Sequence, residues 1–227
     1  MCLIILQTKA KIEVEKKKLV FAYNNNPDGC GIAAIDGGVL KIWKGMPTFA
    51  SFYKTYLEVC ELDSPVLVHF RVGTQGEMNI NNLHPFQVYE DMVFAHNGQI
   101  RMPMNDFKSD TRLFCDDILK HIPRAAYQQP GVWRMMHLAV GKSCLAFMFA
   151  SGETYIVNEY HNGDGHWNKK HTVWYSNNSY DQPNWFEQFN KENTTCYTCS
   201  SKLRHQPDEM IQQTFCETCM ELPGKDE

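Results

Sequence analysis

The chain begins with the sequence Met1-Cys2-Leu3-Ile4-Ile5-Leu6-Gln7-Thr8. This run predicts a β-strand over residues 2–8, and because it is almost entirely apolar we expect burial on both faces. No positively charged segment precedes it, so the run is not interpreted as a secretory signal. A strand that is covered on both sides needs further layers around it, which indicates a mixed fold with helices covering sheets.

Other short apolar runs, separated by turn-forming residues, predict the remainder of one large domain at residues 1–177. Helices are predicted from Pro47 to about Cys60 and from Ser109 to about Ile122, where apolar residues recur near the helical period. The expected strands cover residues 30–35, 39–43, 66–72, 92–95, 145–150, 154–160 and 172–176. Four apolar side chains beyond the second helix are expected in the core: Trp133, Met135, Met136 and Leu138.

Composition limits the classes of protein that this chain can belong to. Its 227 residues are 43% hydrophobic and 21% charged, which suits a folded protein with a buried core. The formal net charge of −4 argues against a strongly basic nucleic-acid binder. No apolar run reaches the roughly 18 residues of a membrane span. Without a visible targeting signal, we expect a cytoplasmic protein that does not bind membranes.

Four of the nine cysteines form two matched pairs near the C-terminus. Two residues between the members of a pair let both thiolates bind one metal ion, and four thiolates favour a closed, structural Zn²⁺ site. Two redox or disulfide pairs, or four unrelated thiols, are the alternatives. We therefore predict a zinc ribbon with its tail over residues 196–227, joined by a linker at residues 178–195. The expected metal ligands are Cys196, Cys199, Cys216 and Cys219.

Cys2 follows the initiator methionine, and a small side chain at position 2 permits removal of Met1. The cysteine would then carry a free α-amine with a pKa of about 7.7–8.0. Such an amine can accept the thiol proton, directly or through a water molecule, and so activate the sulfur as a nucleophile. Taken alone, a cysteine at this position is more often simply a buried strand residue.

Three other segments place polar side chains at a strand end or a helix start. Arg71 ends a buried strand, and its planar guanidinium suits a carboxylate partner. Asn97-Gly98 follows an apolar strand; it is most often a turn, yet a side-chain amide beside a backbone N–H can also hold an oxyanion. Asp110 follows a candidate N-cap, Ser109, where its simpler interpretation is a favourable charge at a helix start.

Together these segments resemble the class II glutamine amidotransferase domain of the N-terminal nucleophile hydrolase superfamily, over about residues 2–177. The resemblance implies an α+β fold, a four-layer αββα sandwich, here followed by the small zinc ribbon. Leu3 and Gly73 depart from the residues that are usual in the family, but neither departure removes a chemical group. The motifs that carry the resemblance are Met1-Cys2, Asn26-Pro27-Asp28-Gly29-Cys30-Gly31, Arg71-x-x-Thr74-x-Gly76, His84-Pro85-Phe86, His96-Asn97-Gly98 and Ser109-Asp110-Thr111.

The resemblance also assigns catalytic roles. Cys2 would attack the side-chain amide carbon of glutamine, form a γ-glutamyl thioester and release ammonia, with its own amine as the general base. The side chain of Asn97 and the N–H of Gly98 would hold the tetrahedral oxyanion.

Substrate binding is assigned in the same way. Arg71 would bind the α-carboxylate of the substrate with assistance from Thr74, and Asp110 would bind its α-ammonium. His84 would form part of the wall of the substrate site. Structural Zn²⁺ is the only cofactor that the sequence implies, and no organic cofactor is expected.

Three hypotheses of function follow. The leading one is a glutaminase that passes ammonia to a separate partner synthase, because residues 178–227 are too few for an acceptor domain. By analogy with small stand-alone proteins of bacteriophages, that partner would modify nucleotides or DNA. The second is a stand-alone γ-glutamyl amide hydrolase, which the sequence around His96-Asn97-Gly98 resembles most. The third is an inactive module that binds nucleic acid or protein through the ribbon.

Overall fold

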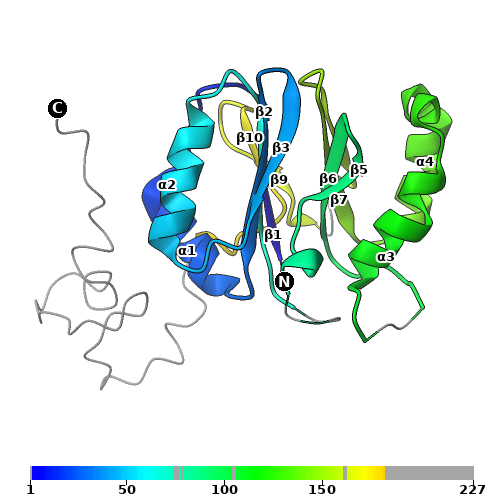
Figure 1. Cartoon of the computed structure of the whole chain (residues 1–227), viewed down its shortest axis with the longest axis horizontal. Helices are drawn as coiled ribbons and strands as arrows, with labels where there is room; N and C mark the ends of the chain where they lie inside the picture. The colour runs from blue at the N-terminus through cyan, green and yellow to red at the C-terminus, as the bar shows by residue number, and fades with distance from the viewer. Residues whose placement is uncertain (1, 74–76, 78, 104–105, 161–162, 182–227) are drawn as a thin grey trace, which may run out of the picture.

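The computed structural model describes residues 2–73, 77, 79–103, 106–160 and 163–181. These residues form four layers: a pair of helices, a six-stranded sheet, a four-stranded sheet and a second pair of helices (Figure 1). The α+β, four-layer αββα architecture expected from the sequence is therefore confirmed. The predicted zinc ribbon, with its four cysteines, and most of the predicted linker lie outside the described residues.

Both sheets are antiparallel throughout. In spatial order, sheet A contains β3 (Val39–Lys44), β2 (Cys30–Asp36), β4 (Val66–Phe70), β1 (Leu3–Gln7), β10 (Val173–Tyr175) and β9 (His166–Trp167). Sheet B contains β5 (Phe86–Tyr89), β6 (Met92–Asn97), β7 (Cys144–Phe149) and β8 (Thr154–Val157). The central position of β1 explains why its sequence is apolar on both faces, as predicted.

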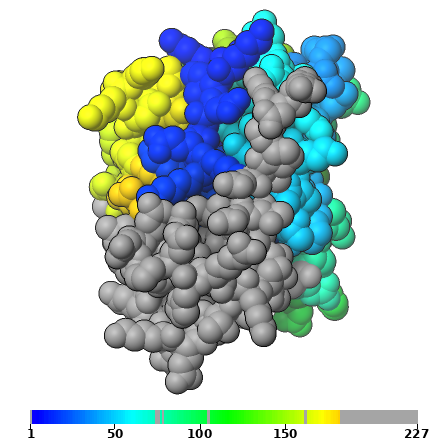
Figure 2. All heavy atoms as spheres, turned by 90° about the vertical axis from the view of Figure 1, so that its left-hand side faces the viewer, coloured from blue at the N-terminus to red at the C-terminus, as the bar shows by residue number. Residues whose placement is uncertain are grey.

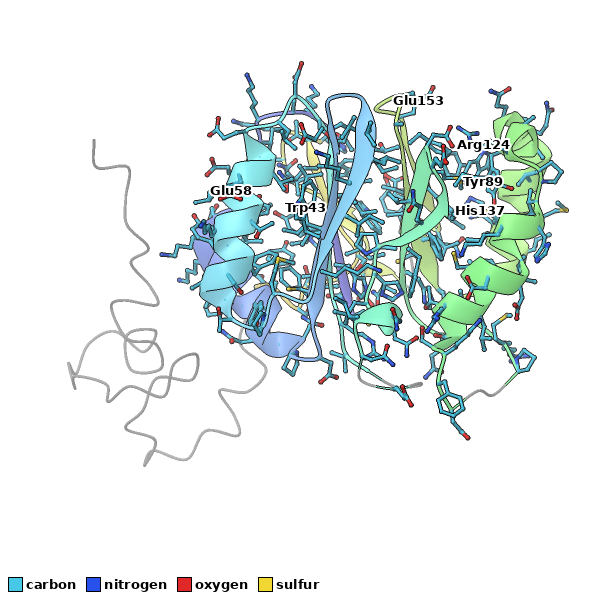
Figure 3. The ribbon with its side chains drawn as sticks, in the orientation of Figure 1. Trp43, Glu58, Tyr89, Arg124, His137 and Glu153 are labelled. Carbon is cyan, nitrogen blue, oxygen red and sulfur yellow. The ribbon has the colours of Figure 1, made fainter. Side chains whose placement is uncertain are left out.

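Two helices cover each outer face. On sheet A these are α1 (Lys16–Asn25) and α2 (Phe49–Cys60), which lie side by side on the face that Figure 2 presents in blue and cyan. On sheet B they are α3 (Asp110–Asp117) and α4 (Pro130–Val140). Figure 3 shows Glu58 on the α2 side of the molecule, with Tyr89, Arg124 and His137 on the opposite side.

Local sequence explains where the two predicted helices begin. Thr48 caps α2, since its side chain accepts a hydrogen bond from the backbone N–H of Ser51 in a reciprocal capping box. The Ser109 side chain caps α3 by accepting a hydrogen bond from the backbone N–H of Arg112 at 3.2 Å. The second helix is shorter than predicted, because it ends at Asp117 and a 3₁₀ turn (Leu119–His121) follows it.

The sequence did not predict α1 or α4, and one core prediction is wrong as a result. Met135 and Leu138 lie on the outer face of α4, 60% and 83% exposed, whereas Trp133 and Met136 are buried as expected. An apolar cluster in a helix spreads around its circumference, so only the residues on one face reach the sheet.

The packed side chains of the two sheets form three clusters. One fills the space between sheet A and its helices, another the space between sheet B and its helices, and a third the space between the two sheets. The third cluster contains Ile4 and Leu6 of β1, Leu67 of β4, Ala95 of β6 and Cys144 of β7, among others. Because side chains alternate along a strand, these residues identify the face of each strand that points between the sheets.

The described chain continues past the expected end of the large domain. Tyr180 is buried in the cluster under α1 and α2, and the backbone oxygen of Ser179 accepts a hydrogen bond from Asn25. Residues 178–181, assigned to the linker from sequence, therefore pack against the domain. Among the described residues, no helix has the length and hydropathy needed to cross a membrane.

Gly31 provides a test of how closely the two sheets approach. A Cβ atom at this position would lie 2.0 Å from the backbone oxygen of His84, an atom that cannot turn away. We expect Gly31→Ala to lower the free energy of unfolding by about 1–3 kcal/mol, the usual cost of overpacking a tight core. Gly131→Ala in α4 is the control, because its Cβ would meet nothing within 4 Å. Equal unfolding curves for the two variants in denaturant would contradict this packing.

Candidate active site

Several of the residues singled out from the sequence meet at one end of the space between the sheets. Cys2 continues the alternation of Ile4 and Leu6, and Asn97 that of Val93 and Ala95, so both belong to inward faces. Arg71 follows β4 on the same face as Leu67, and the register of β1 with β4, in which Leu3 pairs with Phe70, continues to Cys2 opposite Arg71.

The Cys2 thiol is held against the backbone that follows Arg71. The N–H of Val72 donates to the Cys2 sulfur at 3.3 Å, and the thiol lies 3.5 Å from the Val72 carbonyl oxygen. Burial raises the pKa of this thiol, while the Val72 N–H and the nearby Arg71 guanidinium lower it and Asp110 raises it. The sulfur is therefore a neutral thiol in this state and needs a base to become a nucleophile.

The main chain around Arg71 is fixed by the loop after α1. The N–H of Arg71 donates to the Gly29 carbonyl at 2.8 Å, and the N–H of Asp28 donates to the Arg71 carbonyl at 3.1 Å. The Asp28 carboxylate accepts from the N–H of Gly73 at 2.6 Å. Arg71 is only 3% exposed, so this loop holds a nearly buried cation next to the thiol.

Asn97 ends β6 and is bonded across the space between the sheets. Its side-chain amide lies 3.1 Å from Ser176 Oγ, which also accepts the N–H of Ile4 at 2.9 Å. Gly98 follows with a φ of +130°, and a Cβ there would lie 2.4 Å from Ser143 Oγ. Only glycine suits this position, because both the backbone conformation and the space exclude a side chain.

The Asp110 carboxylate at the start of α3 is also firmly oriented. It accepts from the N–H of Ile100 at 2.8 Å and from the N–H and hydroxyl of Thr111 at 2.7 and 3.2 Å. Since the Thr111 hydroxyl donates to Asp110, it must accept from His96 Nδ1, 2.7 Å away. His96 is therefore protonated at Nδ1 and orients Asp110 through Thr111.

His69 and His84 form a buried pair whose protonation follows from their contacts. His69 Nε2 lies 3.1 Å from the carbonyl oxygen of His96, so it carries the proton. His69 Nδ1 then accepts from His84 Nδ1 at 3.2 Å, which leaves His84 Nε2 as a lone pair with no partner among the described residues. Burial lowers the pKa of His69 to about 3 and that of His84 well below its usual range.

These contacts bring together most of the predicted site. Arg71 and Asp110 both lie close enough to Cys2 to act on its thiol electrostatically, and Asn97 pairs across the ladder with Cys144, which also interacts with Cys2. Thr74 lies outside the described residues. A thiol beside one cation, one anion and a buried amide is suited to acyl transfer from a small zwitterionic amide.

The sequence analysis assigned no role to four residues that support the site, although Asp28 and Thr111 stand in the motifs that carry the resemblance. The four are Asp28, Thr111, Ser176 and Asn177, and the Asn177 side chain donates to the Cys2 carbonyl at 2.7 Å. The available signal was a pair of polar residues, Ser176-Asn177, directly after the last apolar strand.

A cavity of about 880 Å³ lies elsewhere, along β8, and is lined by residues such as His137, Asn158 and Trp167. None of the predicted site residues lines it. Within the described ranges, no three His, Cys, Asp or Glu side chains gather in a way that could hold a metal ion.

Comparison with known proteins supports the expected family. Residues 17–128 match the family model of class II glutamine amidotransferases. A Haemophilus influenzae protein, itself provisionally assigned as a glutamine amidotransferase, is 37% identical over 82 residues, which cover 33% of this chain and 27% of that protein. This part of the chain is therefore similar to class II glutamine amidotransferases.

A solved structure shares the fold. Glutamine phosphoribosylpyrophosphate amidotransferase from B. subtilis superposes with a TM-score of 0.52 at 13% identity, covering 77% of this chain and 41% of that one. At this identity the likeness shows the fold alone. A glutamine aminotransferase class-II domain protein from Silicibacter pomeroyi reaches a TM-score of only 0.37 at 15% identity, covering 77% of this chain and 87% of that one.

The buried histidine pair predicts a dependence of stability on pH. Both pKa values are lowered in the folded state, so below the unfolded-state pKa of about 6.5 the unfolded chain binds more protons than the folded chain. Stability therefore decreases as the pH is lowered. For His69 this loss continues down to about pH 3. We expect His69→Gln to reduce the slope of the unfolding free energy against pH by about 1.4 kcal/mol per pH unit between about pH 6 and 4.

The control for this measurement is His121→Gln, because His121 is exposed and keeps its hydration in both states. Denaturant unfolding at a series of pH values gives the slopes. Parallel curves for wild type and His69→Gln would show that His69 takes up its proton without unfolding.

Proposed function

We propose that this protein hydrolyses the side-chain amide of glutamine to glutamate and ammonia through a thioester on Cys2. The observation that carries the proposal is that the Cys2 thiol, at one end of the space between the sheets, lies within electrostatic reach of both the Arg71 guanidinium and the Asp110 carboxylate. The similarity of residues 17–128 to class II glutamine amidotransferases supports the same reaction.

The two charges suit the two ends of the substrate. Glutamine carries an α-carboxylate, for which the planar guanidinium of Arg71 is a bidentate partner. Its α-ammonium would bind Asp110, whose carboxylate is already aimed by Ile100 and Thr111. With both ends of glutamine held, its side-chain amide would lie beside the thiol in a near-attack geometry.

Removal of Met1 would free the amine of Cys2 to accept the thiol proton. The sulfur then bonds to the amide carbon, and the negative charge on the amide oxygen is held by Asn97 and the N–H of Gly98. Collapse breaks the carbon–nitrogen bond, and the proton returns from the amine to the nitrogen, which leaves as ammonia. Water attacks the γ-glutamyl thioester, giving glutamate and the free thiol.

The acceptor of the ammonia is part of the proposal. The chain spans 41% of the B. subtilis enzyme and 27% of the H. influenzae relative, so similarity extends to part of each protein. We propose that a separate synthase takes up the ammonia. Glutaminase activity that rises when such a partner is added would support this role over that of a stand-alone γ-glutamyl amide hydrolase.

We also propose that the four C-terminal cysteines hold a structural Zn²⁺. The chemistry of the donor set supports it, because four thiolates in two matched pairs complete a tetrahedral site with no open position. The ion would stabilise residues 196–227 and would take no part in the reaction at Cys2. Its ligands would be Cys196, Cys199, Cys216 and Cys219.

Zinc content of the purified full chain tests the metal site. We expect one equivalent of zinc by elemental analysis, lost in Cys196→Ser/Cys199→Ser, because two thiolates cannot retain the ion tightly. Cys30→Ser/Cys60→Ser is the matched control, since both thiols are buried in the large domain. Zinc that remains in the first variant would refute the assignment.

Substitution of the nucleophile tests the reaction. We expect Cys2→Ala to reduce glutamate release from glutamine by at least about 10³-fold, since no thioester can form. Coupled assay of glutamate measures the rate, and mass spectrometry of the wild type should show that Met1 is absent and that a glutamine-derived diazo-ketone labels the new first residue.

The matched control is Cys30→Ala, which removes a buried thiol from β2 on the helix-covered face of sheet A. It should retain the wild-type rate. Undiminished glutaminase activity in Cys2→Ala would rule out the mechanism.

A further inference from the structure

The side chain of Asn97 has one polar atom that its surroundings leave without a partner. The residue is only 1% exposed, and its Nδ2 is placed 3.1 Å from Ser176 Oγ. Its Oδ1 is buried and has no hydrogen-bond partner among the described residues. An unpaired acceptor in a buried position is costly, so this arrangement calls for an explanation.

Ser176 shows the complementary problem. Its oxygen already accepts the N–H of Ile4 at 2.9 Å and, in this arrangement, the amide of Asn97 as well. A serine hydroxyl also has one proton to donate. In the described part of the chain that proton has no acceptor, because Ser176 Oγ accepts in both of its hydrogen bonds, from Ile4 and from Asn97.

One half-turn of the Asn97 amide gives the Ser176 proton an acceptor, and it replaces the unpartnered acceptor of Asn97 with an unpartnered donor. The nitrogen and oxygen of an amide have nearly the same shape, so their assignment follows from the hydrogen bonds that they make. With the oxygen turned to Ser176, the hydroxyl donates to Asn97 Oδ1 and still accepts from Ile4. The NH₂ group then occupies the position where the unpartnered oxygen stood.

We infer that Ser176 is a positioning residue that holds the Asn97 carbonyl and thereby turns the Asn97 NH₂ toward the reacting amide. The inference rests on the proposed function, in which Asn97 holds the oxyanion. A carbonyl oxygen at that position would repel the developing negative charge, whereas an N–H stabilises it. The orphaned group becomes a donor whose acceptor forms during the reaction.

The fold places Ser176 well for this task. Ser176 follows β10, and its backbone N–H donates to the Ile4 carbonyl at 3.0 Å while its Oγ accepts from the Ile4 N–H. Two hydrogen bonds to Ile4 therefore fix its position. Ile4 lies two residues after the nucleophile, and Asn97 belongs to the opposite sheet. Ser176 therefore connects the strand that carries the thiol with the strand that carries the amide.

A double-mutant cycle tests the inference. Removal of one oxyanion donor costs about 10²–10³-fold in kcat. We expect Ser176→Ala to lower kcat for glutamine hydrolysis by about 10-fold to 100-fold with little change in KM, because the amide loses its preferred orientation. In an Asn97→Ala background the same substitution should lower kcat by less than about 2-fold, since coupled residues are not additive. Additive losses would overturn the inference.

Ser64→Ala is the matched control. Ser64 is fully buried in the same domain and its Oγ accepts the N–H of Ile35 at 2.7 Å, as Ser176 does for Ile4. It should lose stability without the fall in kcat. A fall equal to that of Ser176→Ala would show that loss of a strand contact alone explains the effect.

Neutron diffraction from deuterium-exchanged wild-type crystals tests the orientation without reference to activity. The inference expects deuterium on the Ser176 hydroxyl directed at Asn97 and two deuterons on the amide atom turned away from Ser176. The opposite arrangement would overturn it, even where Ser176→Ala fails to fold. If the orientation is as inferred but the wild type does not hydrolyse glutamine, the proposed function fails and the orientation stands.

Discussion

The pairing of β1 between β4 and β10 is the constraint on which the candidate site depends. Leu3 is paired with Phe70 and Leu6 with Trp174, so the strand that follows Cys2 is fixed on both edges. A shift of one residue would turn Cys2 to the opposite face, into the cluster beneath α1 and α2. The register of β1 with β4 sets Cys2 opposite Arg71, and the thiol contacts the backbone of Val72, 70 residues away in sequence.

Many polar groups at this end of the space between the sheets are partnered across different elements, which offsets the cost of their burial. Thr111 connects His96 to Asp110, and Asn177 binds the Cys2 carbonyl. His69 and His84 stay neutral because burial, added to the nearby Arg71 charge, disfavours protonation of either ring. The pair therefore adds hydrogen bonds to this end of the space without adding charge beside Arg71 and Asp110.

Sequence predicted the sheets and the site better than the helices. Apolar runs at the period of a strand identified β1, β4, β6 and β7, and a cap identified α3, since these signals are local. The three consecutive lysines at the start of α1 and its contiguous apolar residues Leu19–Ala22 hide its helical face, so the helix was missed. Ser176 was missed for another reason: its role depends on Ile4 and Asn97, which only the tertiary fold brings beside it.

The electrostatics of the thiol place a condition on the proposed chemistry. Burial raises the Cys2 pKa most, the Arg71 guanidinium lowers it and Asp110 raises it. A bound zwitterion would pair its carboxylate with Arg71 and its ammonium with Asp110, so both influences on the sulfur would weaken together. Burial would then be the main influence on the Cys2 pKa, and Arg71 could not stabilise the thiolate at the moment of attack. The proton must leave to a group that the substrate does not neutralise, and the α-amine of Cys2 itself satisfies that condition because it is bonded to the same residue as the sulfur.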